Sequence, residues 1–329
     1  MSDGELLAAL RRMRLISATE RPVFEPLTGG VSSDIVRADL ESGSICLKRA
    51  LPRLKVHAEW TAPVERNRYE ARWLRTAASF APRAVPRVLG EDAEAGVFAM
   101  PYLDPESHPV WKAQLRDGHI CPATAAAVGR IVASIHAGTA DDPEIAARFA
   151  TDAIFHAIRL EPYLVAASLR HPDCAGPLAR LVHITGSTRR GLVHGDVSPK
   201  NILIGPDGPV LLDAECAWYG DPAFDLAFCL NHLLLKCVWR PQWRAGYLEC
   251  FDAAAASYLQ GVTWEPRDAI EKRTAHLLPA LLLGRVDGKS PVEYISTDEA
   301  RDRVRRVGRM LLLHPVDTLD EVRGVSESM

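Results

Sequence analysis

The sequence predicts an α+β fold of two lobes, a small β-rich N-terminal lobe and a larger, mostly helical C-terminal lobe. Up to about residue 100, short segments rich in β-branched residues alternate with turn residues. From Pro101 onward, apolar residues recur at helical spacing instead. We therefore expect two domains, residues 1–100 and 101–329.

The composition is that of a globular protein with a large core. The chain has 329 residues, of which 47% are hydrophobic and 25% charged, and its net charge is -3. Charges of both signs are mixed along the chain, so no nucleic-acid partner is expected. No apolar run has the length of a membrane span, and the N-terminus lacks the apolar core of a signal peptide, which predicts a cytoplasmic protein without a membrane partner. The seven cysteines have no Cys-x-x-Cys spacing and are expected to be reduced core residues.

The small lobe is expected to contain five strands, one helix between the third and fourth, and a short amphipathic helix at the N-terminus. The central helix is expected at about Glu65 to Ala81, and Gly29-Gly30 separates the first two strands. The segment FAMPYLD, Phe98 to Asp104, lies where the composition changes and is the expected hinge. The predicted strands cover residues 23–29, 33–40, 44–50, 85–90 and 96–100.

The large lobe is expected to be helical except at residues 192–215, where β-branched pairs interrupt the helical spacing. The predicted helices cover residues 123–138, 150–170, 175–186, 223–238, 243–260, 267–286 and 298–313.

Residues 192–215 contain acidic and amide side chains at a spacing that suits phosphoryl transfer. Asp196 precedes Asn201 by five residues, and Asp213 follows after a turn that joins two short apolar strands into a hairpin. Phosphoryl transfer needs a carboxylate that orients the attacking hydroxyl and accepts its proton, here Asp196. It also needs ligands for the Mg²⁺ that bridges the nucleotide phosphates, here Asn201, Asp213 and Glu215. Any one of these residues alone would more often be a turn former, but their combined spacing favours the functional interpretation.

Lys48, in the apolar strand SICLKRAL, is the predicted nucleotide-binding cation. A buried cation is costly unless it is paired, and Glu70 on the next helix is the expected partner. The alternative is an exposed lysine on an edge strand. The remaining nucleotide contacts are expected from the glycine-rich turn after the first strand and from the hinge, namely Gly29, Gly30, Ser32, Ser33, Met100 and Tyr102.

Two further residues are expected to support the site. His194 is predicted to fix the catalytic loop by hydrogen bonds to the backbone or to the metal-binding turn, with a direct catalytic role as the alternative. Asp225 is predicted to hold the same loop from the start of a helix, with an ordinary helix cap as the alternative.

The block HGDVSPKNILI, followed by LLDAECAWYGDPAFDLA, resembles the catalytic core of the aminoglycoside phosphotransferase and choline kinase superfamily. Within that superfamily, the segment CLKRALPRLK is similar to the 5-methylthioribose kinases. The resemblance implies a protein-kinase-like fold with ATP and Mg²⁺ as cofactors. It implies Asp196 as the base and Lys48 with Glu70 as the nucleotide clamp. The metal ligands it implies are Asn201, Asp213 and Glu215.

The sequence departs from this pattern at the acceptor site. Ser198-Pro199-Lys200 replaces the usual histidine-containing loop, and Lys200 is assigned to the substrate site. Arg285 is the only counterpart of the arginine pair that methylthioribose kinases bring to the sugar. The helices expected to face the acceptor have a charge balance near neutral or slightly positive, so a small sugar or polyol with a hydroxyl or an anionic substituent is favoured over a polycation.

Four other functions remain open. An aminoglycoside O-phosphotransferase and a choline- or homoserine-type kinase share the same core. A protein kinase is disfavoured because eleven residues between Asp213 and Asp225 leave no activation loop. A non-catalytic pseudokinase would lack at least one of four residues that are all present here, namely Lys48, Asp196, Asn201 and Asp213. A homodimer is a candidate assembly.

Overall fold

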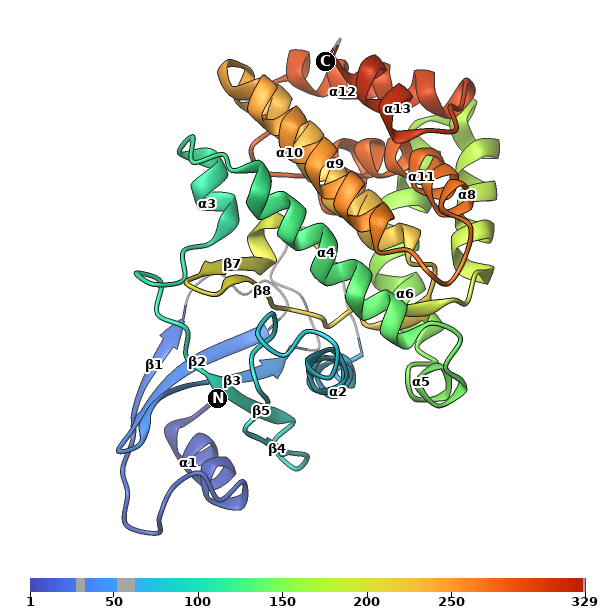
Figure 1. The fold of residues 1–329 in the computed structure, drawn as a ribbon. Helices are drawn as coiled ribbons and strands as arrows, with labels where there is room; N and C mark the ends of the chain where they lie inside the picture. Colours follow the sequence, from blue (N-terminus) through green and yellow to red (C-terminus); the bar gives the residue numbers. More distant parts are fainter. Residues whose placement is uncertain (28–32, 52–62, 328) are drawn as a thin grey trace.

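Residues 1–27, 33–51, 63–327 and 329 are described by a computed structural model of the chain, and they form the predicted α+β fold with a small sheet lobe and a large helical lobe (Figure 1). The sheet has five antiparallel strands in the spatial order β1-β2-β3-β5-β4. Its elements are α1 (Asp3–Arg12), β1 (Val23–Leu27), β2 (Ser33–Leu40), β3 (Gly43–Ala50), α2 (Arg66–Ala78), β4 (Gly90–Asp92) and β5 (Val97–Pro101).

Strand β3 separates two hydrophobic clusters. Because successive side chains of a strand point to opposite faces, Ile45 and Leu47 pack under α1, whereas Cys46 packs in the cluster that contains α2. Lys48 follows the same alternation and lies on the α2 side. The register of this strand therefore directs Lys48 toward the helix that carries its predicted partner.

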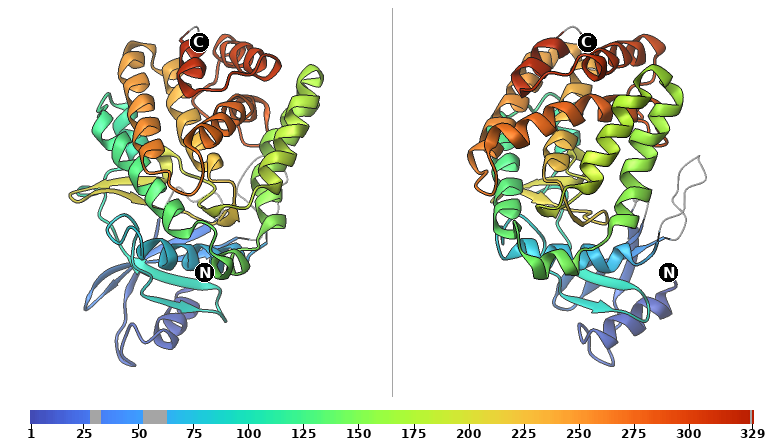
Figure 2. Two further views of the ribbon diagram at one scale, coloured as in Figure 1. Left: turned by 45° about the vertical axis from the view of Figure 1, so that its right-hand side comes forward. Right: turned by 90° about the vertical axis from the view of Figure 1, so that its right-hand side faces the viewer.

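The helical lobe is built around α9, which is buried along nearly its whole length. Most of its buried residues are apolar, as expected for the centre of a large core, and its buried polar residues are Asp225, Asn231, His232 and Lys236. It contacts α4, α10, α11 and α12, and Figure 2 shows these helices packed together away from the sheet. The helices beyond the hinge are α3 (Trp111–Arg116), α4 (Pro122–Thr139), α5 (Pro143–Arg148), α6 (Asp152–Phe155), α7 (Ala166–Arg170), α8 (Ala175–Ser187), α9 (Ala223–Trp239), α10 (Arg244–Gln260), α11 (Arg267–Asp287), α12 (Asp298–Leu313) and α13 (Leu319–Ser326).

Two short strand pairs lie between the sheet and the helices. Strands β7 (Ile202–Gly205) and β8 (Gly208–Leu211) form the predicted hairpin, and Gly208 supplies the positive φ, +115°, that its tight turn needs. Strand β6 (Gly191–Val193) pairs with β9 (Trp218–Gly220), which the sequence did not indicate. The loops that connect these strands form the candidate site.

Two predicted elements of secondary structure were wrong. The strand expected at residues 85–90 begins only at Gly90, because Pro86 has no N–H to donate to a sheet ladder. The helix expected at residues 150–170 is divided into α6, the π-helix η1 (His156–Val165) and α7. Pro162 lies inside η1 and cannot donate a helical hydrogen bond, which favours a local change of helix type.

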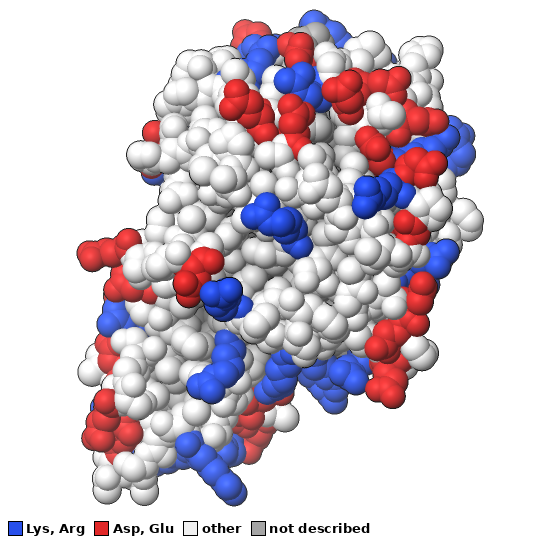
Figure 3. Space-filling model, in the orientation of Figure 1, with Lys and Arg blue, Asp and Glu red and all other residues white. Residues whose placement is uncertain are grey.

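The surface carries charges of both signs. Figure 3 shows them interspersed on one face, around a broad area without charged side chains. All seven cysteines are free, and six of them are buried as predicted; Cys121 is exposed, so the prediction was wrong for this residue. Among the described residues, no helix combines the length and the apolar character needed to cross a bilayer.

Candidate active site

Lys48 joins carboxylates from both lobes. Its Nζ lies 2.8 Å from a carboxylate oxygen of Glu70 on α2 and also contacts Asp213, which follows β8. Lys48 and Glu70 are almost completely buried. Burial lowers the pKa of Lys48, but Asp213 and Glu70 outweigh it and raise the pKa above its ordinary value, so the side chain is a cation at neutral pH. Burial raises the pKa of Glu70 to about 7, although Lys48 opposes this shift.

Asp213 is held in an unusual backbone conformation. Its φ of +68° lies in the left-handed region, which aspartate tolerates better than most residues. Burial raises the pKa of Asp213, but Lys48 and Lys200 outweigh it and lower the pKa below its ordinary value. An ionised carboxylate is thus presented at the end of the hairpin, opposite Lys48.

Asp196 lies in a cationic environment on the loop after β6. Its carboxylate is 3.0 Å from Nη2 of Arg159 and 3.2 Å from Nζ of Lys200, and Ser198 donates a hydrogen bond to it at 3.3 Å. Burial raises the pKa of Asp196, but Lys200 and Arg159 outweigh it and lower the pKa well below its usual range. The ionised carboxylate can accept a hydrogen bond from an alcohol. Because the transition state of phosphoryl transfer is loose, orienting the alcohol matters more than a strong base.

Asp225, at the start of α9, anchors this catalytic loop. It accepts hydrogen bonds from the backbone N–H groups of His194, at 2.7 Å, and Gly195, at 2.8 Å. Gly195 has a φ of +78°, and a Cβ there would come within 2.7 Å of Cys216. Asp225 therefore holds the loop through its backbone N–H groups, which is the role predicted for this residue.

The ring of His194 links the loop to the hairpin. Its Nδ1 accepts the N–H of Asp196 at 3.1 Å, and its Nε2 donates to the carbonyl oxygen of Leu212 at 3.1 Å. Burial lowers the pKa of His194, which favours the neutral ring that these two contacts require. The contacts agree with the supporting role expected for this residue.

The predicted metal ligands do not have equivalent surroundings. Asn201 donates its amide N–H to the backbone carbonyl of Asp196 at 3.1 Å, which leaves its Oδ1 available as a ligand. Glu215 instead pairs with the buried guanidinium of Arg66, at 2.9 Å. No group of three or more His, Cys, Asp or Glu side chains suited to a metal occurs in the described ranges. Magnesium needs only one or two carboxylates besides water and phosphate, so Asn201 and Asp213 fit this ion, which would neutralise charge on the nucleotide phosphates.

The other predicted nucleotide contacts are dispersed or outside the described residues. Met100 is buried on β5, while the ring of Tyr102 lies 4.7 Å beneath the guanidinium of Arg37. Ser33 is buried, and its hydroxyl has no hydrogen-bond partner among the described residues. Among the described residues, neither Tyr102 nor Ser33 forms a hydrogen bond or an ion pair with the side chain of Lys48, whose partners are Glu70 and Asp213. Gly29, Gly30 and Ser32 lie outside the described residues.

Two arginines of the site were not predicted. Arg66 precedes Glu70 by four residues and therefore lies on the same face of α2, a spacing from which the sequence could have indicated it. Arg159 comes from the π-helix η1, where no sequence periodicity marks its direction. The predicted substrate residue Arg285, on α11, forms no ion pair within this network but lines a pocket together with Lys200. Its Nη1 donates to the hydroxyl of Tyr163 at 3.1 Å.

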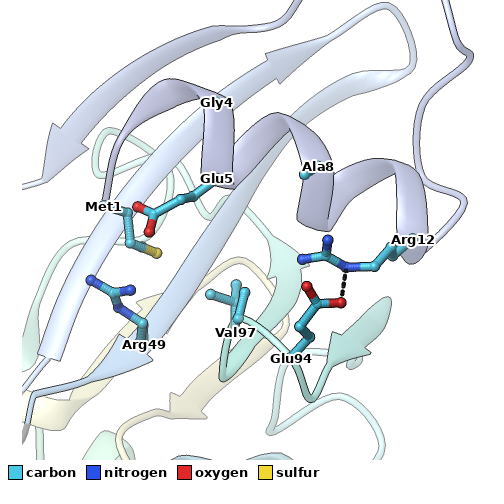
Figure 4. Close-up of a pocket in the computed structure, with 9 residues that line it drawn as sticks. Met1, Gly4, Glu5, Ala8, Arg12, Arg49, Glu94 and Val97 are labelled. Atoms are coloured by element: carbon cyan, nitrogen blue, oxygen red, sulfur yellow. Dashed lines mark ion pairs between the residues drawn. The ribbon is translucent and has the colours of Figure 1, made fainter.

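A cavity lies away from the catalytic loop, beneath α1. Figure 4 shows Glu5, Arg12, Arg49 and Glu94 around this cavity of about 410 Å³. Arg12 lies 3.5 Å from Glu94, so charges of opposite sign are already paired there. It contains none of the predicted site residues.

Comparison with known proteins agrees with this arrangement. The family model described as "Phosphotransferase enzyme family" matches residues 23–259. The methylthioribose kinase of Erwinia tasmaniensis is 28% identical over 228 residues, which cover 60% of this chain and 55% of that protein. Methylthioribose kinase 1 of Oryza sativa is 24% identical over 226 residues, covering 59% and 52%. The chain thus spans just over half the length of the curated relatives it matches.

Solved structures support the fold. Choline kinase from Cryptosporidium parvum has a TM-score of 0.59 at 12% identity, with 98% of this chain and 100% of that chain covered. A choline/ethanolamine kinase family protein from Mesorhizobium loti has a TM-score of 0.53 at 16% identity, with 98% and 99% covered. The two-lobed fold and the predicted relationship to the aminoglycoside phosphotransferase and choline kinase superfamily are confirmed. The chain belongs to the phosphotransferase enzyme family.

Proposed function

We propose that this protein is an ATP- and Mg²⁺-dependent kinase that transfers the γ-phosphate to a hydroxyl of a small sugar or polyol, as its likeness to methylthioribose kinases suggests. The observation that carries the proposal is the contact of one buried ammonium, Lys48, with Glu70 and Asp213 from opposite lobes. A paired cation of this kind is suited to the nucleotide phosphates.

The proposed roles divide between the lobes. Residues 1–100 would bind the nucleotide, with Lys48 at its phosphates. Residues 101–329 would carry the catalytic loop and the acceptor site. Asp213 and Asn201 would hold Mg²⁺, and Asp196 would orient the acceptor hydroxyl and take its proton.

Similar proteins support the choice of nucleotide, metal ion and acceptor. An amicoumacin kinase, 15% identical with a TM-score of 0.53 over 90% of both chains, was solved with AMP-PNP and Ca²⁺. The curated relatives named methylthioribose kinase favour a sugar as the acceptor.

Acceptor-dependent ADP formation tests the proposal. The purified protein would be assayed with Mg-ATP against methylthioribose, other sugars and polyols, their acids, choline and kanamycin. We expect turnover with a member of the sugar, polyol or sugar-acid group and none without Mg²⁺. A much higher kcat/KM for kanamycin or choline would overturn the acceptor class, and the absence of phosphate transfer to any acceptor would overturn the proposed activity.

A further inference from the structure

A small pocket of about 30 Å³ lies beside the catalytic loop. Lys200 joins the two, because it lines the pocket and also pairs with Asp196 at 3.2 Å. The pocket is also lined by the polar and aromatic side chains of Lys112, His232, Lys236, Arg285, Glu293 and Tyr294. A group bound in this pocket would therefore lie next to the carboxylate proposed to orient the acceptor hydroxyl.

The pocket has an excess of positive charge. Four cationic side chains and a single carboxylate, Glu293, line it. Lys112 pairs with Glu293, and Lys200 pairs with Asp196. Within the described part of the chain, Lys236 and Arg285 have no carboxylate partner. Arg285, and Lys236 when it is protonated, are thus left without a counter-ion.

Lys236 is the more unusual of these two cations. The residue is 1% exposed, and its Nζ makes no hydrogen bond with any described residue. Its Nζ lies over the aromatic rings of Tyr294, at 4.8 Å, and Trp239, at 5.2 Å. Burial, with a smaller effect of Lys112, lowers the pKa of Lys236 to about 7. An unpaired buried ammonium is costly, and a bound anion would remove much of that cost.

Arg285 is held in a fixed orientation. Its Nη1 donates to the hydroxyl of Tyr163 at 3.1 Å and to the carbonyl oxygen of Ser290 at 2.6 Å. Its Nε is buried and has no hydrogen-bond partner among the described residues. The nearby ring of His232 also has an unpartnered Nε2, and burial, with Arg285 and Lys236, lowers its pKa well below the ordinary value. Nζ of Lys236 and Nε of Arg285 therefore lack an acceptor, and Nε2 of His232 lacks a hydrogen-bond partner.

We propose that this pocket binds a carboxylate of the phosphate acceptor, so that the acceptor is a small hydroxy acid such as a sugar acid. The inference rests on the proposed function and specifies its substrate class. A cavity of about 30 Å³ is too small for a whole sugar but can admit a small polar group such as a carboxylate. The same charges would repel the ammonium groups of a polycationic acceptor.

Matched acid and neutral acceptors test this inference. D-gluconate would be compared with D-sorbitol, and D-glycerate with glycerol, since each pair differs mainly by a carboxylate. We expect kcat/KM for the acid to exceed that for its neutral counterpart by about tenfold to a hundredfold, the range of a charge-assisted hydrogen bond. Lys236→Met should reduce this ratio toward one. Lys272→Met is the control, because Lys272 is exposed and pairs with Asp317 outside the pocket.

The outcomes separate the two proposals. Transfer to sorbitol or glycerol that equals transfer to the acids would overturn the carboxylate site and leave the kinase activity intact. If no acceptor is phosphorylated, calorimetry with D-gluconate and D-sorbitol still shows whether the pocket binds a carboxylate. Gluconate binding that is lost in Lys236→Met and kept in Lys272→Met would support it, whereas equal or absent binding of both compounds would contradict it.

Discussion

The guanidinium of Arg66 lies 2.9 Å from the carboxylate of Glu215, two residues beyond Asp213. Arg66 is four residues before Glu70, so one turn of α2 carries the partner of Lys48 and also contacts the segment that follows Asp213. The position of α2 is therefore coupled to both lobes of the site.

Replacing Arg66 should destabilise the protein. Arg66→Met would leave Glu215, which is 8% exposed, buried without its ionic partner, and we expect the free energy of unfolding to fall by about 3 to 5 kcal/mol. Urea denaturation would measure this loss. Because the two residues are in contact, Glu215→Gln should cost much less in the Arg66→Met background than in the wild type; purely additive effects would contradict the coupling.

Asp213→Ala should abolish Mg²⁺-dependent nucleotide binding. Without this carboxylate, the ion loses a ligand and Lys48 loses a partner, so the triphosphate is no longer neutralised. Calorimetry with Mg-ATP would measure the affinity. Asp207→Ala, in the exposed turn of the same hairpin, is the matched control and should bind normally. Unchanged Mg-ATP affinity in Asp213→Ala would argue against the metal site.

Asp225→Asn should impair catalysis more than nucleotide binding. The carboxylate accepts the N–H groups of His194 and Gly195 with different oxygens, and an amide can replace only one of these acceptors. The loop that carries Asp196 would then be less well positioned, and we expect kcat to fall by about tenfold to a hundredfold. Steady-state kinetics and nucleotide affinity would be compared with those of Asp207→Asn. A rise in KM for ATP with unchanged kcat would contradict a positioning role.

Lys236→Met should stabilise the protein in a pH-dependent way. The pKa of Lys236 is about 7 in the folded state, below its ordinary value of 10.5, so between these pH values the unfolded chain binds more protons and wild-type stability rises with pH. The variant lacks this pH-dependent cost of burying the charged side chain. Its advantage, about 1 to 4 kcal/mol, should be largest at and below pH 7 and should shrink toward pH 10.

Denaturation at pH 7 and pH 9 would measure this difference. Both proteins share the other charged and titratable groups that face Lys236, so the contributions of these groups to the stability difference largely cancel. These groups are Lys112, Lys200, His232, Arg285, Glu293 and Tyr294. An advantage that is the same at both pH values would show that Lys236 is not an unpaired buried cation.

Local sequence signals were sufficient for the hairpin and for the long helices. The turn between Ile204 and Pro209 has glycine at both ends, and helices such as α4 and α12 have regular apolar spacing, so propensity and burial agree there. The spacing of Asp196, Asn201 and Asp213 also indicated one site, because a short hairpin limits how far these residues can separate.

Long-range contacts were less accessible from sequence. Arg159 reaches Asp196 from a π-helix that contains Pro162, and helical periodicity does not describe the direction of side chains in such a segment. Lys236 is one of four polar residues on the mostly apolar helix α9, and its burial is evident only after α9 is placed at the centre of the lobe. These side chains are positioned by tertiary packing between segments distant in the chain.

The most direct test is transfer of the γ-phosphate of labelled ATP to a small acceptor by the wild-type protein and by Asp196→Asn. The variant should fold and bind Mg-ATP with unchanged affinity, because Asp196 contacts Arg159 and Lys200 and makes no contact with Lys48. Its amide cannot accept the hydroxyl proton, so kcat should fall by about 10² to 10⁴-fold. Labelled acceptor formed by the wild type and nearly lost in Asp196→Asn would support the account, whereas equal transfer by both proteins would contradict it.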